Sequence, residues 1–118
     1  MRISVIGAGY LGAVHATAMA SIGFDVVGVD IDAAKIASLT SGDPPFYEPG
    51  FGDLLRHTMA TDRLLWSRDM AEVADCDLHF LCVGTPQLAG AHGADLRFVE
   101  AAMTAIIPHL QPDSVIAG

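Results

Sequence analysis

The chain has 118 residues, is 52% hydrophobic with a mean hydropathy of +0.43, and carries a formal net charge of −8 at pH 7. This length predicts one domain with its own core, and the high apolar fraction is typical of parallel sheets covered on both faces. The negative charge argues against a nucleic-acid partner. No apolar run approaches the ~20 residues that cross a bilayer. Arg2 leads directly into an apolar run, so we expect no signal peptide and a cytoplasmic protein.

The first half of the chain alternates apolar runs of strand length with segments of helical periodicity. These elements are a strand at 2–6, a helix at 11–22, a strand at 24–29, a helix at 33–40 and a helix at 51–59. Asp32 is a candidate N-cap for the helix at 33–40, and Gly42 lies just beyond its end. Residues 43–50 form a stiff, proline-rich loop rather than a linker between domains.

The second half continues the same alternation. Its predicted elements are a strand at 64–66, a short helix opened by a capping box at 69–72, a strand at 78–83, a helix capped by Asp95 and ended by Pro108, and the beginning of a strand at 114–118. Strands that alternate with helices in this way predict a parallel sheet connected by right-handed crossovers.

The glycine-rich sequence G-A-G-Y-L-G at 7–12 follows the first predicted strand, and Asp30 ends the second. A strand before the glycines, a helix after them and an acid at the end of the next strand form a dinucleotide-binding fingerprint. Gly7 permits the tight turn, Gly9 lets the backbone approach a pyrophosphate, and Gly12 lets the helix pack close to the strand. The alternative is that these glycines serve only turns and packing.

The N–H groups near Tyr10 and Leu11 are expected to face the phosphates, at the positive end of the helix macrodipole. Asp30 is expected to accept hydrogen bonds from the adenosine ribose. Its charge repels a 2′-phosphate, which favours NAD over NADP as the cofactor. The predicted fold class is therefore α/β: a Rossmann-type doubly wound parallel sheet with strand order 3-2-1-4-5, truncated in or after the fifth strand.

Two cysteines are too few for a disulfide framework. Cys82 lies in an apolar run, and Cys76 lies between two aspartates, which raise the pKa of a thiol rather than lower it. The five histidines show no ligand spacing with one another or with the cysteines. The sequence therefore predicts neither a catalytic residue nor a metal site.

The chain resembles the UDP-glucose/GDP-mannose dehydrogenase family along essentially its whole length. The resemblance is carried by the glycine fingerprint, V-D-I-D-x-x-K at 29–35, Y-E-P-G at 47–50, V-G-T-P at 83–86 and A-D-L at 94–96. The pair Y-E-P-G and V-G-T-P is more discriminating than the fingerprint, because other dehydrogenases share the fingerprint alone.

This resemblance implies roles for several residues. Asp30 would bind the adenosine ribose, and Lys35 would reach the same ribose from the other side. Without the resemblance, Lys35 would be interpreted as a solvated helix lysine. Val83, Gly84 and Thr85 would line the nicotinamide-side ribose and the pyrophosphate.

Two residues keep open alternatives. Tyr10 either faces the sugar-nucleotide side of the cleft or is a packing aromatic. Glu48 is either an acceptor that closes its loop by binding backbone N–H groups or a part of the cleft wall, and we favour the structural role.

The resemblance also implies the chemistry, which is oxidation of a nucleotide-sugar C6 hydroxyl to a carboxylate with two NAD, in the manner of a UDP-glucose 6-dehydrogenase of polysaccharide biosynthesis. The family's second step uses a catalytic cysteine, whose motif neither Cys76 nor Cys82 matches. We therefore expect residues 1–118 to be an NAD-binding domain that is inactive alone, without the central helix and the substrate domain. The full-length enzyme is expected to be a homodimer with a nucleotide-sugar substrate and neither nucleic-acid nor membrane partners.

Three alternatives remain open. In the first, the enzyme belongs to the same family but its sugar nucleotide is GDP-mannose or a UDP-N-acetyl-hexosamine. In the second, the chain is a non-catalytic dinucleotide-sensing domain, which would also be short and acidic. In the third, the chain belongs to a dehydrogenase of the 3-hydroxyacyl or 6-phosphogluconate type, which shares the first motif only.

Overall fold

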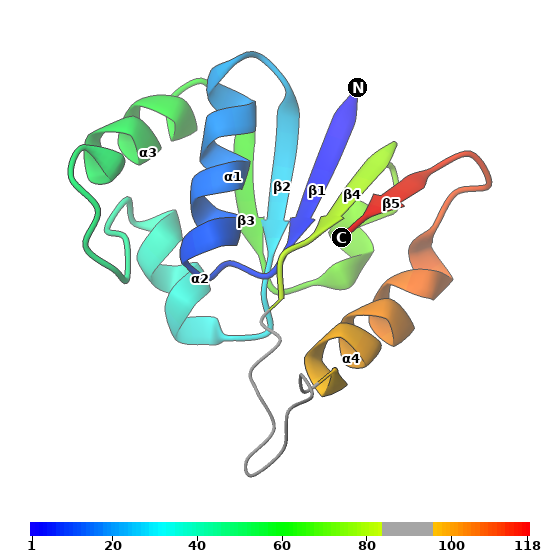
Figure 1. Ribbon diagram of the computed structural model, residues 1–118. Helices are drawn as coiled ribbons and strands as arrows, with labels where there is room; N and C mark the ends of the chain where they lie inside the picture. The colour runs from blue at the N-terminus through cyan, green and yellow to red at the C-terminus, as the bar shows by residue number, and fades with distance from the viewer. Residues whose placement is uncertain (84–95) are drawn as a thin grey trace, which may run out of the picture.

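Five parallel strands form one sheet in the order β3-β2-β1-β4-β5 in a computed structural model, which describes residues 1–83 and 96–118 (Figure 1). The strands are β1 (Arg2–Ile6), β2 (Asp25–Val29), β3 (Leu64–Ser67), β4 (Leu78–Leu81) and β5 (Val115–Ala117). Every neighbouring pair is parallel. The predicted Rossmann-type α/β fold class and strand order are confirmed.

Helices connect the strands and cover the sheet (Figure 1). They are α1 (Tyr10–Ser21), α2 (Ala33–Thr40), α3 (Phe51–Met59) and α4 (Arg97–Ile106), with 3₁₀ turns η1 (Met70–Val73) and η2 (Ile107–His109). Within the described residues, no helix is both long enough and apolar enough to span a membrane.

The two faces of the sheet bury separate apolar clusters, because successive side chains of a strand point to opposite faces. Ile3 and Val5 of β1 pack with α1, α2 and α3, whereas Ile6 packs on the other face with η1 and α4. On β2, Gly28 leaves room for Trp66 of the neighbouring strand, since a Cβ at Gly28 would lie 2.2 Å from the indole ring.

Two local predictions need correction. Strand β4 ends at Leu81 and not at Val83, because its partner β1 ends at Ile6, which pairs with Leu81. The predicted capping box at 69–72 is only half formed. Asp69 accepts the Ala71 N–H at 3.0 Å, but the N–H of Asp69 donates to Ser67 Oγ instead of to the Glu72 carboxylate, and the helix is a single 3₁₀ turn.

Other local predictions hold. The Asp32 carboxylate caps α2 by accepting the N–H groups of Ala34 at 2.9 Å and Lys35 at 3.2 Å. Helix α4 ends at Ile106, and Pro108 falls in the 3₁₀ turn that follows. The predicted cap at Asp95 lies outside the described residues.

Candidate functional site

A cleft of about 1050 Å³ opens at the carboxyl ends of β1, β2 and β4. Strand order reverses between β1 and β4, which is where doubly wound sheets bind ligands. The predicted site residues that line this cleft are Gly7, Gly9, Tyr10, Leu11, Asp30, Lys35 and Val83. Gly12 is buried behind it, and Gly84 and Thr85 lie outside the described residues.

The three fingerprint glycines have different surroundings. Gly7 has a φ of +105°, and a Cβ there would lie 2.7 Å from the carbonyl of Cys82. A Cβ on Gly12 would lie 1.7 Å from the carbonyl oxygen of Gly7, so α1 begins in direct contact with the turn that follows β1. A Cβ on Gly9 would meet no atom within 4 Å. Gly7 and Gly12 therefore serve the fold, while Gly9 borders open space at the cleft.

The N-terminus of α1 faces this space without a capping side chain. Gly9 is the N-cap, no side chain accepts from the first turn, and that turn contains no acidic residue. The first N–H groups of a helix have no partner within the helix, and the macrodipole adds partial positive charge there. Because α1 runs for 12 residues and borders a cleft through Tyr10 and Leu11, this end fits a phosphate group.

The carboxylate of Asp30 is fixed by the backbone. The Ala8 N–H donates to Oδ2 at 2.7 Å, and the Asp32 N–H donates to Oδ1 at 2.8 Å. A carboxylate has about four acceptor sites, so each oxygen retains capacity for a further donor. Asp30 thus ties the glycine-rich turn to the start of α2 and still lines the cleft, which fits a ribose diol.

Sequence reasoning missed these backbone bonds of Asp30. The bond to Asp32 had a local signal, because an aspartate often accepts the N–H two residues further on. The bond to Ala8 had none, since it joins residues 22 positions apart. Lys35 is half-buried in the first turn of α2. Among the described residues that line the cleft, it is the one with a basic side chain.

Tyr10 packs as an aromatic and also lines the cleft. Its ring lines the cleft and meets Phe46 edge-on, with centroids 5.2 Å apart. Its hydroxyl donates to Oε2 of Glu48 at 2.8 Å. This hydrogen bond, followed by desolvation and the negative charge of Glu48, raises the pKa of Tyr10 above its usual value.

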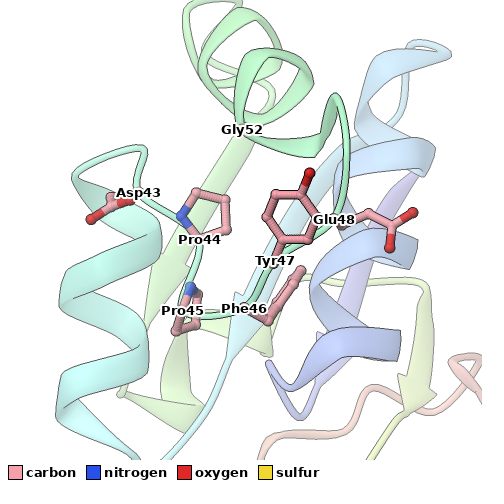
Figure 2. A pocket seen from close by; sticks show the side chains of 7 residues that line it. All are labelled: Asp43, Pro44, Pro45, Phe46, Tyr47, Glu48 and Gly52. Atoms are coloured by element: carbon pink, nitrogen blue, oxygen red, sulfur yellow. The ribbon is translucent and has the colours of Figure 1, made fainter.

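The role expected for Glu48 is only partly right. Its carboxylate is a structural acceptor, but it accepts the hydroxyl of Tyr10. Within the parts of the chain that the structure describes, no backbone N–H donates to it. Figure 2 shows the Glu48 side chain extending from the proline-rich loop toward α1. Glu48 also lines a shallow hollow of about 450 Å³ that this loop forms with Gly52. Tyr47 is 89% exposed beside this hollow.

Neither cysteine is activated. Burial raises the pKa of both Cys76 and Cys82. For Cys76, a hydrogen bond to Arg2 opposes the shift, and the predicted effect of the flanking aspartates is smaller than burial. Among the described residues there is also no group of three or more histidine, cysteine or acidic side chains that could hold a metal.

Comparison with known proteins assigns the family. The model of the UDP-glucose/GDP-mannose dehydrogenase family, NAD binding domain, matches residues 1–118. The chain is 42% identical to UDP-glucose 6-dehydrogenase of Rhizobium meliloti over 117 residues, which are 98% of this chain and 27% of that protein. The chain thus spans about a quarter of the length of this relative.

Solved structures agree. A GDP-mannose dehydrogenase of Pseudomonas aeruginosa, solved as a ternary complex, superposes with a TM-score of 0.84 at 40% identity, over 90% of this chain and 24% of that one. A UDP-D-ManNAc dehydrogenase of Pyrococcus horikoshii superposes with a TM-score of 0.93 at 28% identity, over 98% of this chain and 27% of that one. The chain therefore belongs to the UDP-glucose/GDP-mannose dehydrogenase family and matches the NAD-binding domain of that family over its whole length.

Proposed function

We propose that this chain supplies the NAD site of an enzyme that oxidises the C6 hydroxyl of UDP-glucose to a carboxylate, with two NAD consumed per sugar. The observation that carries the proposal is the pairing of an uncapped helix N-terminus with a fixed carboxylate in one cleft. These two features match the pyrophosphate and the ribose of an adenosine diphosphate group.

Different residues would bind different parts of the cofactor. The N–H groups of Tyr10 and Leu11 would bind the pyrophosphate, with Gly9 allowing its close approach. Asp30 would accept the adenosine ribose hydroxyls and Lys35 would bind the same ribose. When bound, NAD supplies the acceptor for the hydride that leaves the sugar carbon.

The remaining cofactor contacts fall near the end of β4. Val83 would line the nicotinamide-side ribose, since it borders the cleft just beyond Leu81. Gly84 and Thr85 would continue that contact, and they lie outside the described residues. This part of the proposal rests on the V-G-T-P motif at 83–86.

UDP-glucose is proposed because the Rhizobium relative that carries this activity in its name aligns along 98% of the chain. Two further proposals concern the whole protein. It acts as a homodimer, and it acts in the cytoplasm, where the free thiols of Cys76 and Cys82 persist. We also propose that residues 1–118 alone form no NADH, because they match the NAD-binding domain of the family and span only about a quarter of the Rhizobium relative.

Calorimetric titration of the 118-residue chain with NAD and with NADP tests the cofactor assignment. We expect NAD to bind and NADP to bind more weakly, because Asp30 faces the position of the 2′-phosphate. Equal affinities would refute the role of Asp30.

For the substrate, the full-length protein is assayed for NADH with UDP-glucose, GDP-mannose and UDP-N-acetylmannosamine. We expect activity with UDP-glucose and two NADH per sugar, and a preference for another sugar would refute that part.

A further inference from the structure

The proline-rich loop at 43–50 contacts Tyr10, which lines the cleft. We propose that Glu48 is a positioning residue for the cofactor: its carboxylate holds the hydroxyl of Tyr10, so that the ring forms a fixed wall at the phosphate end of the cleft. This inference rests on the proposed NAD site, and it gives the Y-E-P-G motif at 47–50 a role in cofactor affinity.

The wall is connected to the core through a series of packed aromatic rings. The Tyr10 ring meets Phe46 edge-on at 5.2 Å, and Phe46 stacks on Phe51 with centroids 5.3 Å apart. Phe51 is only 4% exposed and belongs to the apolar cluster under α1. Figure 2 shows Phe46 and Glu48 both directed from the loop toward α1. Ring packing thus fixes one side of Tyr10 and the bond to Glu48 fixes its hydroxyl.

The backbone of the loop is fixed where it carries Glu48. The Phe51 N–H donates to the carbonyl oxygen of Glu48 at 3.1 Å, which closes the turn before α3. Pro49 restricts its own φ, and Gly50 adopts a φ of +80°, which side chains disfavour. The carboxylate on this fixed backbone already accepts the Tyr10 hydroxyl without a ligand.

Without this bond, Tyr10 would be an exposed aromatic in the first turn of a helix. It is still 52% exposed, so the packing on Phe46 covers only part of the ring. A side chain that must be ordered on binding reduces affinity, whereas one ordered beforehand does not. The hydrogen bond to Glu48 also raises the pKa of Tyr10, so its phenol remains a donor.

Calorimetry with NAD tests the inference on the 118-residue chain. Glu48→Ala and Tyr10→Phe are each expected to weaken NAD roughly threefold to tenfold, the range of one ordinary hydrogen bond. The double variant should be no weaker than the weaker single variant, because both changes break the same bond. Glu48→Gln keeps an acceptor and should stay within about twofold of the parent. Tyr47→Phe, beside Glu48 but 89% exposed, is the matched control and should change nothing.

A second readout does not depend on NAD. The chain has two tyrosines, so a Tyr47→Phe background leaves Tyr10 as the only one that titrates. Its pKa, followed by ultraviolet absorbance, should lie above the ordinary value and should fall when Glu48→Ala is added.

The outcomes separate the two claims. If the parent binds NAD and Glu48→Ala binds it equally well, the positioning role is wrong and the NAD site stands. If the parent does not bind NAD, both claims fail. A Tyr10 pKa that Glu48→Ala leaves unchanged overturns the contact itself. Melting temperatures of all variants are compared, and a loss of affinity that tracks a loss of stability also counts against positioning.

Discussion

Gly12 and Gly9 are predicted to respond in opposite ways to the same added methyl group. In Gly12→Ala the new Cβ would lie 1.7 Å from the carbonyl oxygen of Gly7 and 3.2 Å from Cβ of Cys82. Ordinary contact therefore requires α1 to withdraw by roughly 1.5–2 Å from the turn after β1. Overpacking costs about 1–3 kcal/mol when side chains can adjust. Here the obstacle is backbone, so we expect a loss near the upper value, about 3 kcal/mol.

Gly9→Ala meets no such obstacle. No atom lies within 4 Å of the added Cβ, and the backbone at Gly9 (φ −70°, ψ −169°) suits alanine. Replacing a glycine in a compatible conformation stabilises a protein by about 0.4–1 kcal/mol. The methyl group nevertheless stands where the pyrophosphate would approach. Loss of one charge-assisted hydrogen bond, about 1.5–3 kcal/mol, lowers NAD affinity at least about tenfold.

Thermal unfolding and NAD titration of the two variants measure these effects separately. Trp66 is the only tryptophan and is buried between β2 and the helices, so its fluorescence reports unfolding. At about 4 °C per kcal/mol, Gly12→Ala should melt about 12 °C below the parent, and Gly9→Ala should melt at or slightly above it. If Gly12→Ala melts with the parent while Gly9→Ala melts far lower, the assignment of packing to one glycine and binding to the other is wrong.

Three further changes have defined outcomes. Asp30→Ala frees two backbone N–H groups, so stability should fall by about 1–3 kcal/mol and the NAD/NADP affinity ratio should narrow; unchanged melting and an unchanged ratio would contradict this. Burial lowers the pKa of His79 against the opposing charge of Asp77, so below pH 6.5 the unfolded chain takes up a proton that the folded chain does not. The free energy of unfolding should therefore decrease as pH falls from about 6.5, by at most about 1.4 kcal/mol per pH unit. Urea unfolding at pH 7 and at pH 5.5 measures this decrease, which should be smaller in His79→Gln. An equal decrease in the parent and the variant would refute the prediction. Gly28→Ala places a Cβ 2.2 Å from the Trp66 ring and should cost about 1–3 kcal/mol, largely recovered when Trp66→Leu is added; a parental melting temperature would exclude this clash.

The sequence predicted the features that local signals encode. Apolar runs and helical periodicity located the five strands, and Asp32 at the start of α2 was recognisable as an N-cap from its type and position alone. The strand order followed from the alternation of elements and the rule on crossover handedness. This arrangement of the strands in turn predicted that Gly7 and Asp30 lie together at the carboxyl edge of the sheet.

The features that the sequence could not predict depend on residues far apart in the chain. The Tyr10–Glu48 bond spans 38 positions and depends on where the proline-rich loop docks. The close fit of Gly28 against Trp66 depends on the register of two neighbouring strands. Even the short capping motif failed in part, because Ser67 competes for the N–H of Asp69 once β3 extends to that residue.

The central claim is that NAD lies over the N-terminus of α1 with its adenosine ribose on Asp30. An NAD titration of the isotopically labelled chain, followed by backbone amide chemical shifts, tests it most directly. The account predicts the largest shifts at Gly9, Tyr10 and Leu11, a second group at 30–32 around the Asp30 carboxylate, and no shift at 61–63, on the opposite edge of the sheet where β3 begins. Shifts confined to the hollow beside Tyr47, or no shifts at saturating NAD, would contradict it.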